Sequence, residues 1–237
     1  MRLDKFLSIT GTCSRSDAKR AIRAKSITVN GTVARTADAQ VNENRDEILF
    51  YGRKIIYRQY SYIMLNKPEG VVSATDDGRD TTVLDLLPDG VRNERMFPCG
   101  RLDKNTLGLM LITDNGDLAH RLLAPKSHVS KRYRFKARDP ISQSDAKRFE
   151  DGLTLEDGYV TQPARIELDD GGTGGIITLT EGKYHQIKRM LEALDNKITY
   201  LERISFGPLV LDGALARGEW RYLNEHEIAE LEKHGKL

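Results

Sequence analysis

The sequence has few cysteines and no long apolar run. Its 237 residues include only two cysteines, Cys13 and Cys99, which are too few for a disulfide scaffold and too scattered for a zinc site. Its five histidines form no H-E-x-x-H pattern, so we expect no metal site. No stretch approaches the roughly 18 apolar residues of a membrane helix, and the opening residues lack the apolar middle of a signal peptide. We therefore expect a globular protein of the cytoplasm that does not enter a membrane.

Two common catalytic motifs are also missing. The glycine-rich segment DDGGTGG, residues 169–175, lacks the Gly-Lys-Ser/Thr ending of a phosphate-binding loop and lies between two strand-like runs. It therefore predicts a hairpin turn. The chain contains no G-x-S-x-G motif, so nothing supports a serine hydrolase of that kind.

The net charge is small, but positive charge is concentrated locally. The net charge is only +2, yet residues 1–60 contain 12 Lys or Arg against 6 Asp or Glu. A second run, residues 121–138, contains seven Lys or Arg and no acid. Blocks of one sign usually face a partner of opposite charge, and phosphate is the commonest such partner. The alternative is that these cations form the solvated face of a strand.

The first sixty residues contain the pattern of two short helices. Apolar residues recur at helical spacing over residues 3–9, and Gly11 can end that helix. A second helix, capped by Ser14 or Ser16, would bury its alanines and turn its cations outward. Those cations are Arg15, Lys19, Arg20, Arg23 and Lys25.

A hairpin signal follows the second helix. The segment SITVNGTVAR alternates around Asn30-Gly31, the strongest short hairpin signal in a sequence. Together, the R-L-D-K-F, S-R-S-x-A-x-x-x-I and V-N-G patterns resemble the alpha-L RNA-binding module of a small-subunit ribosomal protein and of tyrosyl-tRNA synthetase. The resemblance implies that residues 1–60, connector included, bind RNA by charge and shape. It adds Arg2 and Lys5 to the five helix cations, and the alternative is a small α+β cap with a solvated basic side.

The remaining residues, 61–237, predict a second and larger domain. A polar connector is expected between about residues 51 and 61. Beyond it, strands are expected at 62–65, 107–112 and 175–179, and helices at 81–87, at 116–123 and in the amphipathic tail 224–237. The long helical crossovers of a parallel sheet are missing, so we expect an α+β domain with a mainly antiparallel mixed sheet and flanking helices.

One acid in this domain lies in an unusual place. Asp103 stands between Arg101 and Lys104, just before the buried strand at 107–112, where a solvated turn is the ordinary explanation and catalysis the other. A second stretch, EGKYHQIKRM, has cations near the start of an expected helix, a good arrangement for holding an anion. These cations are Lys183, Lys188 and Arg189.

Four segments in order resemble the RsuA-like rRNA pseudouridine synthases. They are LNKPEG, GRLDKNTLGLMLITDNGDLAHRL, KRY at 131–133 and EGKYHQIKRM, and they span nearly all of residues 60–205. The resemblance implies isomerisation of an rRNA uridine to pseudouridine without any cofactor, by a protein that we expect to be monomeric. Relatives that modify large-subunit RNA tend to carry Asn-Arg-Gln where this chain has Tyr184-His185-Gln186. The resemblance therefore favours 16S rRNA within a small-subunit assembly intermediate.

The resemblance also assigns the catalytic residues. It makes Asp103 the nucleophile or base, Lys188 its cationic partner, Tyr133 the ring that packs against the target base, and Arg101 the residue that fills the gap left by the flipped nucleotide. A carboxylate in a pocket dry enough for a base needs a cation nearby to stay ionised. Taken singly, each of these residues could equally be an exposed charge, a turn acid or a strand residue.

Further RNA contacts are expected around this site. They are Lys131, Arg132, His185, Gln186 and Arg189. The basic run at 121–138 and the basic face of the first sixty residues would hold the flanking RNA backbone. Two alternatives remain open. One is a large-subunit rRNA or tRNA pseudouridine synthase of the same chemistry, and the other is a ribosome-assembly factor that binds RNA without catalysis.

Overall fold

The computed structural model describes residues 1–10, 12–43, 45–55, 57 and 59–234. Contacts between Cα atoms divide the chain into two compact units. The first unit contains residues 1–60 together with Pro88–Glu94, and the second contains residues 61–87 and 95–237. None of the helices in the described part of the chain has the length and apolar character needed to traverse a bilayer.

The first unit packs two helices against a small sheet. Helices α1 (Leu3–Ile9) and α2 (Arg15–Arg23) contact each other, and the antiparallel sheet has the order β2-β1-β3-β4. Its strands are β1 (Ile27–Val29), β2 (Thr32–Val33), β3 (Ile48–Phe50) and β4 (Arg53–Ile55). Buried apolar side chains of both helices and of β1 and β3 form the core. The two predicted helices are confirmed, whereas the predicted stop at Gly11 lies outside the described residues.

Local capping and turn chemistry explain where these elements begin. The Ser14 hydroxyl accepts a hydrogen bond from the Asp17 backbone N–H and so caps α2, as predicted. Asn30 and Gly31 have φ of 50° and 77°, the left-handed pair that a tight hairpin requires. The predicted hairpin is confirmed by the antiparallel pairing of β1 with β2.

The predicted connector is partly wrong. Strand β4 lies within residues 51–61 and forms a second hairpin with β3, through a turn at Tyr51-Gly52 whose φ values are 48° and 75°. The exposed, charged residues of β4 give the strand the composition of a linker. The segment is a strand because it pairs with β3, not because it has an apolar pattern of its own.

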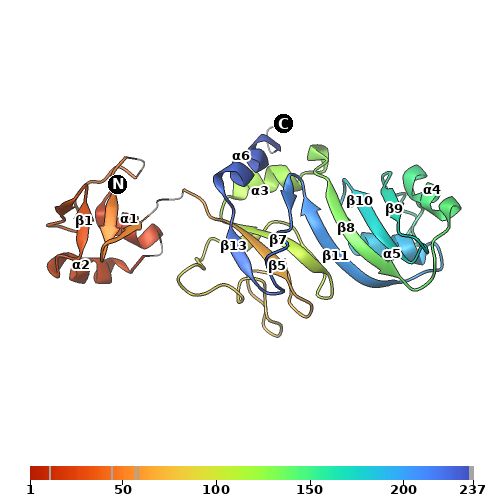
Figure 1. Ribbon diagram of the computed structural model, residues 1–237, viewed down its shortest axis with the longest axis horizontal. Coiled ribbons are helices and arrows are strands. Elements are labelled where there is room, and N and C mark those ends of the chain that lie inside the picture. The colour runs from red at the N-terminus through yellow and green to blue at the C-terminus, as the bar shows by residue number, and fades with distance from the viewer. Residues whose placement is uncertain (11, 44, 56, 58, 235–237) are drawn as a thin grey trace. The chain divides into compact units, whose positions relative to one another are not determined.

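A large twisted sheet forms the second unit (Figure 1). Its strands run in the order β13-β5-β7-β11-β8-β10-β9, with β6 paired to β7 and β12 to β11. The strands are β5 (Tyr62–Lys67), β6 (Phe97–Pro98), β7 (Leu107–Thr113), β8 (Lys131–Ala137), β9 (Arg165–Leu168), β10 (Gly174–Leu179), β11 (Ile198–Phe206), β12 (Leu209–Val210) and β13 (Trp220–Tyr222). Among these strands only β7 and β11 pair in parallel, which confirms the mainly antiparallel mixed sheet.

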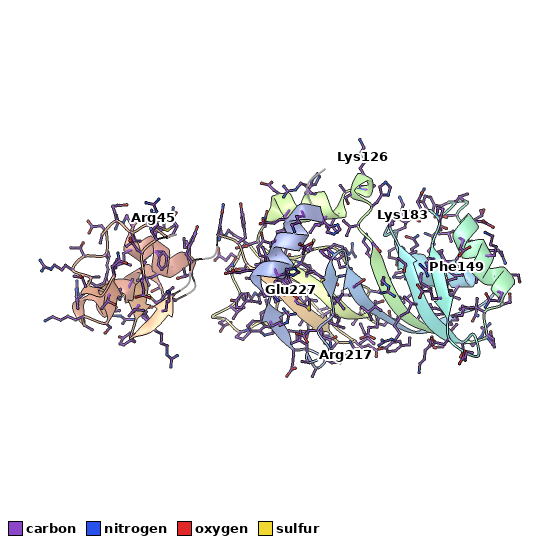
Figure 2. The ribbon with its side chains drawn as sticks, turned by 45° about the horizontal axis from the view of Figure 1, so that its top comes forward. Arg45, Lys126, Phe149, Lys183, Arg217 and Glu227 are labelled. Carbon is purple, nitrogen blue, oxygen red and sulfur yellow. The ribbon has the colours of Figure 1, made fainter. Side chains whose placement is uncertain are left out.

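Helices flank this sheet in two groups. Helices α3 (Gly116–Leu123) and α6 (Glu225–His234) lie beside β13, β5 and β7, whereas α4 (Gln143–Asp151) and α5 (Gln186–Glu192) lie beside β8 to β10 (Figure 1). A short 3-10 helix, η1 (Pro125–Ser127), follows α3. Figure 2 shows Phe149 between α4 and the sheet, where its side chain is fully buried. The predicted helix at 116–123 is confirmed, and the predicted tail helix is confirmed as far as His234.

The predicted helix at 81–87 is wrong. Thr82 instead forms a parallel bridge with Val72, and a tight turn follows it. The Asp85 carboxylate accepts hydrogen bonds from both the backbone N–H and the hydroxyl of Thr82. Such local side-chain bonds offer the backbone an alternative to helical pairing, and they decide the conformation here.

Candidate active site

The loop that carries Asp103 joins β6 to β7, and a buried lysine forms hydrogen bonds with the backbone of this loop. Lys67, at the end of β5, is completely buried. Its ammonium group lies within hydrogen-bond distance of four backbone carbonyls, those of Pro68, Asp103, Lys104 and Thr106, at 2.9 to 3.2 Å. Burial lowers the pKa of Lys67 to about 8, partly offset by the nearby charge of Asp103. The lysine therefore fixes the backbone at the acid and directly after it.

A second set of bonds fixes the residue before the acid. The Ser73 hydroxyl donates to the Leu102 carbonyl at 2.8 Å and accepts from the Leu102 N–H at 3.0 Å. The Thr106 N–H closes a turn onto the Asp103 carbonyl at 3.0 Å. With its backbone bonded on both sides, Asp103 presents its side chain from a rigid turn.

The acid meets a lysine and a histidine from another part of the chain. Lys188, on α5, places its amine 2.6 Å from Asp103 Oδ2 and 2.7 Å from Asn105 Oδ1. His185, just before α5, places Nε2 at 3.4 Å from the other carboxylate oxygen, Oδ1. The side chains of Asp103 and Lys188 are 27% and 20% exposed, so the pair is screened by water only in part. The arrangement places an amine and an imidazole against the two oxygens of one carboxylate.

A cleft with a volume of about 1140 Å³ opens at this acid. Tyr133 on β8 and Arg203 on β11 are paired neighbours in the sheet and form part of its wall. Tyr133 is only 9% exposed and Arg203 only 2%, with Arg203 Nε donating to the Leu109 carbonyl at 2.8 Å. The cleft is larger than the pockets of about 300 to 1,000 Å³ that usually bind small molecules. A polymer segment would fill it better than a single small metabolite.

Lys131 makes a further positive charge at the cleft. Its amine donates to the Val129 carbonyl at 2.8 Å and lies 5.8 Å from the centre of the Phe206 ring. Burial, together with the nearby charge of Arg203, lowers the pKa of Lys131 to about 8. Among the described residues, no group of three or more His, Cys, Asp and Glu side chains is placed to hold a metal ion.

The loop before α5 is tied together by one buried amide. The Gln186 side chain accepts from the Lys183 N–H at 2.9 Å and donates to the Glu181 carboxylate. Glu181 also accepts from the Tyr159 hydroxyl at 2.7 Å and from the Gln162 N–H at 2.9 Å. Figure 2 shows Lys183 near the ends of β8 and β10. These bonds set the position of His185, the residue beside the acid.

The structure brings most of the predicted site residues together. Arg101, Asp103, Lys131, Tyr133 and His185 line the cleft, and Lys188 lines a smaller recess that also includes Asp103 and Tyr133. Their elements are far apart in the sequence, since 85 residues separate Asp103 from Lys188.

Three predicted RNA contacts lie outside the lining of the larger cleft. Gln186 is 4% exposed, lines the smaller recess beside Asp103 and bonds within its own loop, so its contact with RNA stays a prediction. Arg132 alternates with Tyr133 along β8, so its exposed side chain lies on the opposite face of the strand. Arg189 forms an ion pair with Asp157 at 2.6 Å and lies outside the lining of the cleft.

In the first unit, the predicted basic surface surrounds a hollow of about 490 Å³. It is lined by Arg2, Asp4, Lys5, Arg15, Ser16, Lys19, Arg20 and Arg23. The remaining predicted cation, Lys25, is exposed outside this lining. Two of the lining cations have acidic partners, because Arg2 pairs with Asp4 and Arg20 with Asp17.

Two buried cations at the site, Lys67 and Arg203, were not predicted. A lysine at the end of the apolar strand YIMLNK, directly before a proline, was a signal that could have identified Lys67. Arg203 lies in the mixed segment ITYLERISF, where no local pattern separates a buried arginine from an exposed one. Its role becomes visible only when β11 is placed between β7 and β8.

Comparisons with known proteins agree with this geometry. Residues 61–193 match the family model described as RNA pseudouridylate synthase, and residues 1–46 match the S4 domain. The chain is 46% identical to an uncharacterized RNA pseudouridine synthase, YtzG, of Bacillus subtilis, over 96% of this chain and 97% of the relative. It is 38% identical to ribosomal small subunit pseudouridine synthase A of Haemophilus influenzae, over 98% and 100% of the two chains.

A solved structure is similar over almost the whole length. The crystal structure of a pseudouridylate synthase has a TM-score of 0.68 and 36% identity, and the match covers 98% of this chain and 99% of that one. Both the family model and the full-length relatives include the segments that carry Asp103 and Lys188. The chain therefore belongs to the RNA pseudouridylate synthase family and carries an S4 domain at its N-terminal end.

Proposed function

We propose that this enzyme converts one uridine of small-subunit rRNA to pseudouridine, with Asp103 as the catalytic carboxylate. The observation that carries the proposal is the contact of 2.6 Å between Asp103 and Lys188, beside a cleft of about 1140 Å³ that Asp103 also lines. Its support for small-subunit rRNA is the name of several full-length relatives, ribosomal small subunit pseudouridine synthase A.

The reaction moves a base without oxidation or reduction. The bond between C1′ of the ribose and N1 of uracil breaks, the base turns, and a bond forms between C1′ and C5. A proton then leaves C5, and N1 gains one, so atoms and electrons balance within the nucleotide. A carboxylate beside the sugar can assist either by attacking C1′ or by taking up a proton, and both roles require the charged form of Asp103.

Neighbouring side chains would prepare the base for this step. A uridine stacked in folded RNA must leave the stack before an enzyme can reach its glycosidic bond, at a cost of a few kcal/mol. Arg101 is exposed at the cleft and can fill the space that the base vacates. The ring of Tyr133 offers a flat apolar surface for the uracil.

The basic surface of the first unit would supply affinity rather than base identity. Lysine and arginine contacts to phosphate place a protein on RNA, but they do not read the bases. In this proposal, residues 1–60 act as an RNA-binding domain and residues 61–237 as the catalytic domain of a monomeric cytoplasmic enzyme.

Pseudouridine mapping tests the proposal directly. Carbodiimide labelling with primer extension would be applied to rRNA from cells that lack the protein and from cells that carry Asp103→Asn. We expect one 16S site to lose its modification in both strains and to regain it when the parent protein is restored. Loss of a 23S or tRNA site instead would redirect the substrate assignment, and survival of every site in both strains would leave only a non-catalytic RNA-binding role.

A further inference from the structure

Among the described residues of the second unit, Tyr184 has the most exposed large apolar or aromatic side chain. It is 73% exposed and lies in the lining of the catalytic cleft. One face of its ring is covered by the imidazole of His185, with ring centres 3.8 Å apart and planes 19° from parallel. With one face covered and most of the side chain still exposed, the other face is open to a further flat group.

This two-ring stack is held in place before any substrate binds. His185 has a φ of 49°, a left-handed conformation that persists only where the surroundings impose it. The Gln186 amide and the Glu181 carboxylate close the loop around it. A surface that is already ordered loses little conformational freedom on binding, so its contacts are fully available for affinity.

The stack also begins beside the reacting group. His185 Nε2 lies 3.4 Å from Asp103, so a ring resting on the open face of Tyr184 would lie two aromatic layers away from the acid. A nucleotide that continues the strand from the reacting uridine would reach such a position. Lys183 is exposed on the same loop and can meet its phosphate.

We propose that Tyr184 binds the base of the nucleotide next to the target uridine by stacking on its open face. Stacking suits any base, because every base has a flat aromatic face, and it requires that base to be unpaired. The substrate would therefore present at least two consecutive unpaired nucleotides, which means RNA in which this stretch is not yet paired. The inference rests on the proposed function for its choice of substrate.

A fluorescent base provides the test. The probe is a short single-stranded RNA with one uridine and with 2-aminopurine on its 5′ or 3′ side, added to the full-length Asp103→Asn protein so that no reaction occurs. We expect quenching from one of the two positions. Tyr184→Phe should preserve the quenching, whereas Tyr184→Ala should remove it and weaken binding about tenfold, the size of one base–aromatic stack.

Two controls locate the effect. Tyr222→Ala alters an exposed tyrosine on β13, outside the cleft, and should leave quenching unchanged. Annealing a strand that pairs the 2-aminopurine and leaves the uridine unpaired should remove the Tyr184-dependent signal. Equal quenching and affinity in the parent and Tyr184→Ala proteins would overturn the proposal. Because the readout needs no turnover, it is independent of the mapping experiment that tests the reaction itself.

Discussion

We expect the catalytic role of the Asp103 carboxylate to depend on the amine of Lys188. Replacing Lys188 by methionine keeps most of the side-chain volume and removes the charge 2.6 Å from Oδ2. We expect the single-turnover rate to fall about 100-fold, which corresponds to about 2.7 kcal/mol of transition-state stabilisation. Lys188→Arg should retain part of the rate, because it restores the charge with a different shape.

A nearby lysine provides the matched control for this prediction. Lys197→Met removes an exposed amine shortly after α5, away from the acid, and should leave the rate unchanged. A Lys188→Met protein that melts like the parent and reacts within about threefold of its rate would show that the ion pair is not needed for catalysis.

The half-buried amine of Lys131 predicts an alkaline gain in stability. Its pKa falls from 10.5 to about 8 on folding, so between these pH values the unfolded chain keeps a proton that the folded chain has lost. Raising the pH through this window therefore favours the folded state. Relative to Lys131→Met, the parent should gain about 1 to 3 kcal/mol of unfolding free energy from pH 8 to pH 10.5.

The single tryptophan, Trp220, lies in β13 and can report this transition during chemical denaturation. Burial raises the pKa of the Cys99 thiol to about 12, which has the opposite effect on stability above pH 9. Both proteins keep Cys99, so the comparison of parent with variant cancels the effect of burial on the thiol and leaves only the smaller interaction between Lys131 and Cys99. A difference in unfolding free energy that stays constant with pH would contradict the prediction.

At the scale of elements, the parallel contact between β7 and β11 depends on a glycine. Gly108 has a φ of 98°, and a Cβ there would lie 2.3 Å from the Arg203 carbonyl oxygen. Gly108→Ala should therefore separate the strands or strain the backbone, costing about 3 to 5 kcal/mol of stability. Gly213→Ala meets no atom within 4 Å and is the matched control in denaturation followed by Trp220 fluorescence.

Elements with a chemical signal at their own ends were predictable. Ser14 marks the start of α2 and Asn30-Gly31 marks the first hairpin, because a cap and a left-handed turn each need particular residues. Strand β4 and the turn at residues 82–85 were not predicted correctly. Their conformations depend on a strand partner and on the bonds between Thr82 and Asp85, which compete with helical propensity.

The residues of the site also divide into those that the sequence identified and those that it did not. Asp103, Tyr133 and Lys188 came from a resemblance in ordered motifs, and the structure brings them around one recess. The buried Lys67 and Arg203 could not be ranked from the sequence, because their exposure is set by the strands that cover them. The bonds of the Gln186 amide within its own loop were not visible in the sequence either, because they depend on Glu181 and on the turn before α5.

At the scale of the whole molecule, charge is divided between the two parts of the chain. Residues 1–60 have a balance of +6, and the remainder has a balance of −4. Replacing Arg15, Lys19 and Arg23 by glutamine should weaken RNA binding and make it less dependent on salt. The slope of the logarithm of the binding constant against the logarithm of the salt concentration should fall in magnitude by roughly 0.7 to 0.9 for each phosphate contact that is lost.

The matched control for this change uses cations of the second unit. Lys147 and Lys233 are exposed on α4 and α6, where they already pair with acids on the same helices. Their replacement by glutamine should leave the salt slope unchanged, and filter binding at several salt concentrations measures both sets. Equal slopes for the parent and the triple variant would place the RNA contact elsewhere.

The sheet order has a consequence for how the protein is made. Strand β7 emerges from the ribosome long before β11, its parallel neighbour. Helix α5, which contains Lys188, contacts β11 and can do so only after β11 has been synthesised. Contacts so distant in sequence form slowly and only when both partners exist. A nascent chain therefore holds the acid for some 85 residues of translation without its counter-ion. Catalytic competence should appear only after Lys188 and β11 have left the ribosome.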